Sequence, residues 1–176
     1  MNKEELKILE ILDSLIRQKH AITILDSTVT RVEHKLMLEP EALLAWEPVP
    51  LSIYGGKLPD TIQSSWVFVL RAGATTGAER HPNSHQRMIS YRGSGDLQTW
   101  NGKRWCSHIL VSDTDSPIKN RCLSIPSNIW HQAVVPQDNW VVIGLHTVPA
   151  DELIEERQDQ TDATLTHQRR YLEKQR

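Results

Sequence analysis

Turn signals recur at short and regular intervals through the central part of this chain. From Ser65 onward, a break rich in Gly, Pro, Asn or Asp comes roughly every eight to twelve residues. The breaks fall at Gly73, Pro82-Asn83, 93–95, Asn101-Gly102, 113–117, Pro126-Ser127 and 136–139. This rhythm is typical of an antiparallel sandwich or barrel. Because 176 residues with 39% hydrophobic content are enough for one continuous core, we expect one domain of the all-β class.

The first 20 residues follow a different pattern, in which apolar side chains recur at helical spacing. These side chains are Leu6, Ile8, Leu9, Ile11, Leu12, Leu15 and Ile16. Asn2 and Glu5 stand like the two ends of a capping box, so we expect an amphipathic helix within residues 1–20. Its apolar face needs a partner, which is either the outside of its own domain or a second subunit in a homodimer.

Residues 21–148 are expected to form the barrel. β-branched residues cluster in 21–25 and 28–32, which predicts that strands begin directly after His20. The stretch 39–60 is rich in Pro and Gly and is expected to be loop and edge strand. Residues 149–176 are acidic and then basic, which predicts a C-terminal tail that is helical or partly disordered.

The sharpest local prediction is a hairpin turn at Asn101-Gly102. This dipeptide supplies the two positive φ angles of a type I′ turn, so positive φ is expected at both residues. Residues 97–100 should pair with 105–111. Trp100 and Trp105 would then pack across the hairpin as structural residues.

Composition argues against several classes of function. A formal charge of -2 and a pI near 6.4 give no basic field for nucleic acid or anionic lipid, so neither is expected as a partner. Cys106 and Cys122 form no CxxC pair, which fits a reducing compartment. The N-terminus does not read as a secretory signal, and no run approaches the roughly 18 apolar residues that cross a bilayer. We expect a cytoplasmic protein.

Two stretches carry polar residues at the spacing of a known pair of motifs. The first reads Gly73, five residues, Glu79, Arg80, His81, four residues, Gln86, six residues and Gly93. The second reads Pro126, Ser127, Asn128, Ile129, Trp130 and His131. They resemble the cupin motifs G-x5-H-x-H-x3-4-E-x6-G and G-x5-P-x-G-x2-H-x3-N. This resemblance to the cupin superfamily covers 65–147 and implies a jelly-roll barrel, the double-stranded β-helix, with short N- and C-terminal helices.

The chain departs from these motifs at defined positions. Glu79 stands where the first His usually is, and Gln86 stands where the Glu usually is. In the second motif Asn128 replaces the second Gly, while Asn120 and Val135 replace the first Gly and the final Asn. The expected fold therefore depends on both motifs together with the strand rhythm.

The spacing has a physical meaning of its own. Residues 79 and 81 are two apart on a strand, so Glu79 and His81 leave the same face. A turn can bring Gln86 alongside them, and His131 comes from a different strand. Inside an apolar barrel a polar group without a partner costs a few kcal/mol. These four polar side chains must therefore bind a metal ion, bind a ligand or pair with one another.

The resulting set suits a divalent metal. Two imidazoles and one carboxylate are the ligands of non-haem Fe(II) oxygenases, and Gln86 can add a neutral oxygen. Fe(II) is favoured, with Mn(II), Ni(II), Zn(II) or Co(II) as alternatives. The opposing interpretation is a barrel without metal, in which His81 and His131 are hydrogen-bonded pocket residues.

Four more residues are candidates for the surroundings of the site. Met88 and Ser90 share the face of Gln86 and should line the pocket. His146 lies on the closing strand, which could bring it near the pocket. His85 points to the opposite face by strand alternation and is a weaker candidate for an outer contact. Arginines that could reach a substrate carboxylate are Arg80, Arg87 and Arg92.

Three functions are compatible with these residues. The leading one is a metal-dependent enzyme that acts on a small polar organic molecule, with a dioxygenase as the favoured reaction. The second is a non-catalytic binding or sensor barrel in which the same four residues hold a ligand directly. The third is a metal-free isomerase or epimerase on an activated sugar, which would need a His base, an acidic partner and several arginines in the pocket.

Overall fold

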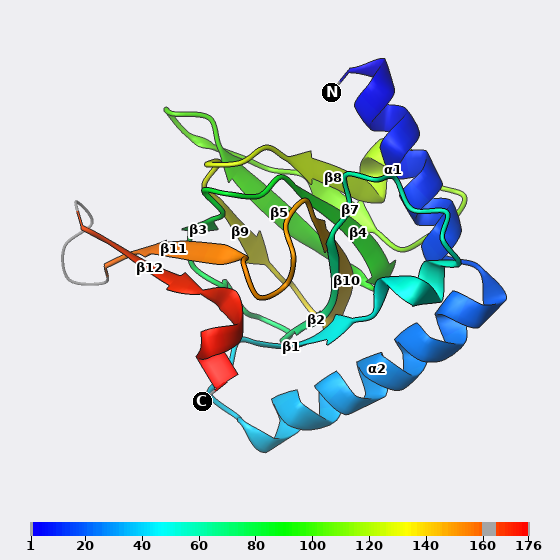
Figure 1. The fold of residues 1–176 in the computed structure, drawn as a ribbon. Helices are drawn as coiled ribbons and strands as arrows, with labels where there is room; N and C mark the ends of the chain where they lie inside the picture. Colours follow the sequence, from blue (N-terminus) through cyan, green and yellow to red (C-terminus); the bar gives the residue numbers. More distant parts are fainter. Residues whose placement is uncertain (1, 160–164, 176) are drawn as a thin grey trace.

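The computed structural model describes residues 2–159 and 165–175, with two helices followed by strands in two antiparallel sheets (Figure 1). The helices are α1 (Lys3–Ile16) and α2 (Lys19–Leu38). The strands are β1 (Leu44–Val49), β2 (Ser64–Leu70), β3 (Glu79–Arg80), β4 (Gln86–Arg92), β5 (Ser94–Trp100), β6 (Trp105–Cys106), β7 (Ile109–Val111), β8 (Cys122–Ile125), β9 (His131–Val134), β10 (Trp140–His146), β11 (Ile154–Gln158) and β12 (Thr166–Arg170). Short 3-10 turns are η1 (Leu51–Tyr54), η2 (Ile118–Asn120) and η3 (Tyr171–Gln175).

The strand order is that of a jelly roll. One sheet has the order β1-β2-β10-β4-β8, and the other has the order β12-β11-β3-β9-β5-β6, with β7 also paired to β5. From β2 to β5 successive strands alternate between the two sheets, and they do so again from β8 to β10. This arrangement confirms the expected fold. Strand β1 widens the first sheet at one edge, and the β11–β12 hairpin widens the second.

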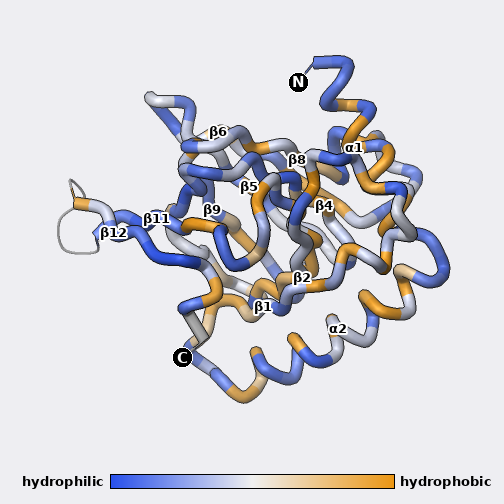
Figure 2. Tube along the Cα trace, viewed as in Figure 1, coloured by the Kyte–Doolittle hydropathy of each residue, from blue (hydrophilic) through white to orange (hydrophobic). Residues whose placement is uncertain are grey.

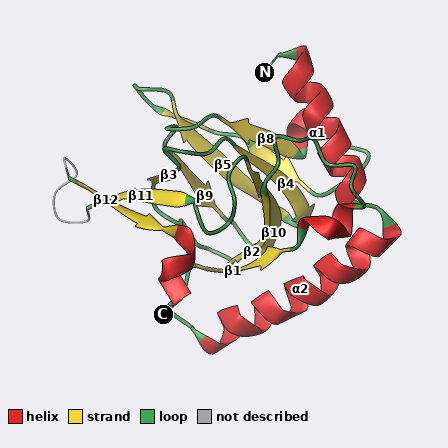
Figure 3. Cartoon of the chain, viewed as in Figure 1, coloured by secondary structure: helices red, strands yellow, loops and turns green. Residues whose placement is uncertain are grey.

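Apolar side chains form two cores on the two faces of the first sheet. Strand β2 shows the division, because Trp66 and Phe68 belong to the core between the sheets, whereas Val67 and Val69 belong to the core under the helices. Both helices lie on the outer side of this sheet (Figure 3). The helices therefore cover the outer face of the first sheet, and the core between the two sheets lies on its other face.

The segment directly after His20 is a helix, so the prediction of strands at 21–25 and 28–32 is wrong. Residues 19–38 form α2, and the barrel begins with β1 rather than at residue 21. The buried apolar residues of α2 recur every three or four positions, at Ala21, Leu25, Val29, Val32 and Leu36. This spacing, visible as interspersed apolar positions in Figure 2, outweighs the weak strand preference of the β-branched residues. The hydroxyls of Thr23 and Thr28 donate to the carbonyls four residues earlier.

Helix α1 has the expected start and the expected buried face. The Asn2 Oδ1 accepts a hydrogen bond from the Glu5 backbone N–H at 2.8 Å. Leu9, Leu12 and Ile16 are fully buried in the core beneath the first sheet, so their partner is the chain's own domain. No described helix is long and apolar enough to span a membrane.

The hairpin after β5 forms, but its turn differs from the prediction. Trp100 pairs with Trp105, leaving four residues in the loop, and the Asn101 side-chain oxygen accepts the backbone N–H groups of Lys103 and Arg104. Among described residues only Gly102 of the dipeptide has a positive φ, at 91°, so the prediction for Asn101 is wrong. The rings of Trp100 and Trp105 pack edge to face at 5.6 Å, as expected.

The C-terminal segment is also different from the prediction of a helical or partly disordered tail. Its described residues form β11, which pairs with β3, and β12, which pairs with β11. Glu155 and Glu156 are buried by this pairing. The tail therefore belongs to the second sheet and reaches the strand that carries Glu79.

Candidate functional site

Three potential metal ligands meet on the inner face of the second sheet. Glu79 on β3 lies directly opposite His131 on β9, and His81 follows two residues after Glu79. Each of the three offers a ligand atom, and these atoms lie within 4.8 Å of one another. The expected convergence of Glu79, His81 and His131 is therefore present in the geometry.

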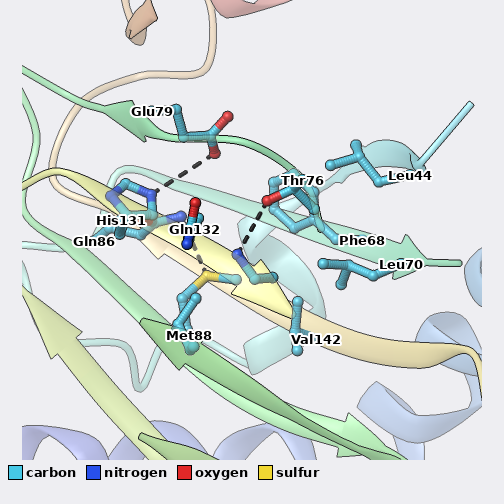
Figure 4. Close-up of a pocket in the computed structure, with 12 residues that line it drawn as sticks. Leu44, Phe68, Leu70, Thr76, Glu79, Gln86, Met88, His131, Gln132 and Val142 are labelled. Atoms are coloured by element: carbon cyan, nitrogen blue, oxygen red, sulfur yellow. Dashed lines mark hydrogen bonds and ion pairs between the residues drawn. The ribbon is translucent and has the colours of Figure 1, made fainter. Parts of the chain in front are cut away.

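Hydrogen bonds fix which nitrogen each imidazole presents. The His81 Nδ1 lies 2.9 Å from the carbonyl oxygen of Ile154, and the His131 Nδ1 lies 3.0 Å from that of Ile129. A carbonyl only accepts, so each Nδ1 carries a proton, and the Nε2 is the nitrogen left to bind an ion. The His131 Nε2 is buried without a hydrogen-bond partner and lies 3.7 Å from the Glu79 Oε1 (Figure 4).

Burial keeps His81 neutral. Burial, followed by the nearby His131, lowers the pKa of His81 to about 3. A metal ion needs the unprotonated imidazole, so His81 is in the required state at neutral pH.

Gln86 lines the same cavity as Glu79 and His131. It opens β4, and its Oε1 is buried without a hydrogen-bond partner, while its Nε2 donates to the Met88 sulfur at 3.2 Å. The cavity measures about 30 Å³, room for one or two water-sized groups. Its other walls are mostly apolar, with Leu44, Phe68, Leu70, Leu97, Ala133 and Val142 beside Thr76, Met88 and Gln132 (Figure 4). His81 lies outside this lining.

His146 is a further buried histidine, and it contacts His81. It lies on β10 directly opposite Gln86, and its ring centroid is 4.9 Å from that of His81. Its Nδ1 lies 3.2 Å from the Ser84 hydroxyl, and its Nε2 is buried without a hydrogen-bond partner. Burial, followed by the two other histidines, holds the pKa of His146 well below its usual range.

The structure places the other candidates away from the cavity. His85 lies on the helix side, where its Nε2 contacts the Ser124 hydroxyl at 2.6 Å, so it is no outer contact of the site. Ser90 is buried but accepts the Trp140 indole N–H and does not line the cavity. The three candidate arginines have other carboxylates as partners, with Arg80 on Glu156, Arg87 on Glu5 and Arg92 on Asp26 and Glu33.

The sequence reasoning missed Arg157. This residue lies on β11 directly opposite Glu79, and its Nη2 contacts the Glu79 Oε2. The Nε of Arg157 also donates to Glu155, which is fully buried, at 3.0 Å. Burial works against the charged guanidinium, but the charges of Glu79 and Glu155 outweigh it and raise the pKa of Arg157. The sequence of 154–158, Ile-Glu-Glu-Arg-Gln, carries no alternating pattern that would reveal this strand or its pairing with β3.

The donor set fits a divalent ion. Neutral imidazole nitrogens, one carboxylate and one amide oxygen are ligands that Fe(II) and related ions accept. An ion held by these three residues would satisfy the His131 Nε2, a buried atom that has no hydrogen-bond partner, and the Gln86 Oε1 is a second such atom among the residues that line the cavity. The carboxylate is already shared, because the Glu79 Oε2 faces Arg157 while the Oε1 faces His131.

Comparisons with known proteins find similar solved structures and no family. No family model matches the chain, and no curated protein matches it. Oxalate oxidase in complex with the substrate analogue glycolate is similar at 13% identity and a TM-score of 0.46, over 61% of this chain and 52% of that chain. Pumpkin seed globulin is similar at 19% identity and a TM-score of 0.48, over 64% of this chain and 27% of the globulin chain. A cupin-like protein from Thermotoga maritima is similar at 25% identity and a TM-score of 0.43, over 59% of this chain and 68% of that chain.

The chain thus spans about half of the oxalate oxidase chain and about a quarter of the globulin chain. The fold is therefore assigned from the strand order of the molecule itself. A jelly roll has eight strand positions in two sheets that face each other across a core. Strands β2 to β10 fill these positions, with β6 and β7 together in one of them. By that order, the chain has the jelly-roll fold.

Proposed function

We propose that the chain is a metal-dependent enzyme in which Glu79, His81 and His131 hold a divalent ion and Gln86 is a fourth donor. The proposal depends on one observation, the placement of three ligand atoms within 4.8 Å of one another. The substrate would be a small polar organic molecule, and the favoured reaction is that of a dioxygenase. Fe(II) is the favoured ion, ahead of Mn(II), Ni(II), Zn(II) and Co(II).

The chain's own residues supply geometry and a dry environment. Bound Fe(II) would supply the activation of oxygen and substrate at open coordination positions. The carbonyls of Ile154 and Ile129 hold the two imidazoles in one tautomer, and Arg157 orients the Glu79 carboxylate. Apolar walls such as Phe68 and Val142 keep bulk water from the cavity.

The test is a metal assay followed by a reaction assay. Protein purified without chelator is analysed for metals, and oxygen uptake is then measured with thiols, diketones and aromatic diols. His131→Ala is expected to lose both the metal and the uptake. His85→Ala is the matched control, because His85 lies on the helix side, and it should keep both. Metal retained fully by His131→Ala would overturn the proposal.

A second candidate is a ligand-binding barrel without metal. The ion pair between Glu79 and Arg157 favours it, because the carboxylate already has a positive partner. In that case the purified protein would hold no metal, and oxygen uptake would be absent with every compound. Added Fe(II), Mn(II) and Ni(II) would then leave the melting temperature unchanged.

A further inference from the structure

Tyr171 is a single buried residue in an otherwise accessible stretch. Residues 165–170 and Glu173 are exposed and Leu172 is half-buried, whereas Tyr171 is 1% exposed. Its ring enters the core between the two sheets, at the side where β1 and β12 form the sheet edges. In Figure 1 the red turn that carries it lies beside β1 and β2.

The ring of Tyr171 is surrounded by other rings. Its centroid lies 4.9 Å from Trp46, 5.4 Å from Trp66 and 6.1 Å from Phe68, in tilted or edge-to-face contacts. His81, one of the proposed metal ligands, lies 6.1 Å away. We call the space bounded by Trp46, Trp66, Phe68 and His81 the aromatic chamber. Such spacings suit a flat aromatic occupant.

The aromatic chamber adjoins the metal-site cavity. Phe68 is a wall of both, and His81 belongs to both the chamber and the ligand set. The cavity of about 30 Å³ is far below the roughly 300–1,000 Å³ of ordinary ligand pockets. An organic substrate therefore needs space that the chain's own tyrosine now fills.

The segment that carries Tyr171 is attached at an edge. Strand β12 pairs with β11 and ends the second sheet among the described strands. Tyr171 itself is held by its backbone N–H, which donates to the Leu153 carbonyl at 2.8 Å. The contacts of β12 with β11 include Arg169 with Glu155, in which the arginine is 41% exposed. Release of the segment would open one strand ladder and leave the jelly roll itself intact.

Tyr171 is itself a phenol, and its ring already occupies the chamber. A ligand with one ring and one hydroxyl would meet the same surroundings.

We propose that the aromatic chamber is a binding site for a single-ring phenolic compound, and that residues 166–175 leave with Tyr171 to admit it. The proposal deepens the proposed function by naming a class of substrate. Only the chemical reaction of that substrate rests on the proposed function. Binding in the chamber needs no metal, so its failure and the failure of the metal site are separable.

The test uses 4-methylphenol, the free form of the tyrosine side chain, with full-length, metal-free protein. Binding is measured by calorimetry, and exchange of the Tyr171 amide is followed by NMR. Saturating 4-methylphenol is expected to speed exchange of this amide at least tenfold, because the compound takes the place of the ring. Exchange of the Val67 amide on β2 serves as the internal reference and should not change.

Two variants complete the design. Tyr171→Ala should bind 4-methylphenol roughly 10–100-fold more tightly than the wild type, because no ring competes. Leu172→Ala changes the neighbouring half-buried residue and should bind within twofold of the wild type. Wild-type protein that shows no binding, or binding without faster Tyr171 exchange, would overturn the proposal even if Tyr171→Ala binds, because Tyr171 would then be a fixed core residue. Equal binding of 4-methylcyclohexanol would overturn the assignment to aromatic compounds.

Discussion

Arg157 and Glu79 lie directly opposite each other on β11 and β3 and form an ion pair at the edge of the proposed metal site. The other oxygen of the Glu79 carboxylate faces the His131 Nε2 at 3.7 Å. One carboxylate thus connects the C-terminal hairpin to the inner face of the jelly roll.

Arg157→Met should destabilise the fold by about 2 to 4 kcal/mol, because it leaves Glu79 and the fully buried Glu155 short of a positive partner. This expected loss of stability is smaller than for a fully buried ion pair, because the Arg157 side chain is 27% exposed. Urea unfolding at pH 7 measures it. Arg92→Met is the control, and its cost should be about 1 kcal/mol or less because Arg92 is 53% exposed and its partner Asp26 is 48% exposed. Equal effects of the two variants would contradict the role given to Arg157.

Glu79→Gln and Gln86→Glu should change metal affinity in opposite directions. Glu79→Gln removes the carboxylate of the set and should cost more than the roughly 10–100-fold that loss of an outer partner costs. Gln86→Glu adds a negative charge and should bind a divalent ion more tightly, while lowering stability without metal because it places a second carboxylate near Glu79. Melting with and without Fe(II), Mn(II) and Ni(II) measures both. A Gln86→Glu protein that is destabilised and gains nothing from any of the three ions would exclude the metal site.

Metal-free protein should lose stability as the pH falls below about 6.5, the ordinary pKa of histidine. Burial lowers the pKa of His81 to about 3 in the fold, and lowers that of His146 as well. The unfolded chain therefore takes up protons that the folded chain does not, and unfolding is favoured from about pH 6.5 down to the folded pKa. Each histidine contributes up to about 1.4 kcal/mol per pH unit in this window.

Urea unfolding at pH 7.5, 6.5, 5.5 and 4.5 measures this slope. His146→Asn removes one of the two groups, so its slope should be smaller than that of the wild type. A wild-type free energy of unfolding that stays constant from pH 6.5 to 5.5 would contradict the assignment of both histidines as neutral.

Gly144→Ala should disturb the cavity wall. Gly144 lies on β10, and a Cβ there would stand 2.8 Å from the Phe68 ring and 3.3 Å from the Met88 sulfur. The expected cost is about 1–3 kcal/mol, typical of overpacking in a core. Thermal melting measures it, and the double variant with Phe68→Leu should recover part of the loss. A fully stable Gly144→Ala protein would show that Phe68 has room to move.

The parts of the site that depend on strand alternation could be predicted from the sequence. Glu79 and His81 share a face because they are two apart, and the motif spacing joined them to His131 and Gln86. Arg157 could not be found in this way, because it lies 78 residues after Glu79 and meets it through pairing of β11 with β3. Long-range pairing leaves no local pattern.

The same distinction holds for the fold. The turn rhythm predicted an antiparallel sandwich or barrel correctly, since each break limits the length of a strand, and the motif resemblance implied the jelly roll. For α2 the composition of 21–32 indicated strands, whereas the spacing of Leu25, Val29, Val32 and Leu36 was helical. Burial of one face decides between the two, and periodicity reports burial more directly than composition does.

The pairing of β3 with β11 also sets the order in which the site is completed during synthesis. Glu79 emerges from the ribosome 78 residues before Arg157. At about 5–20 residues per second, this leaves an interval of about 4–16 s. Over that time the nascent carboxylate meets water and dissolved cations without competition from the guanidinium. All four proposed metal ligands therefore leave the ribosome before the guanidinium that shares the Glu79 carboxylate.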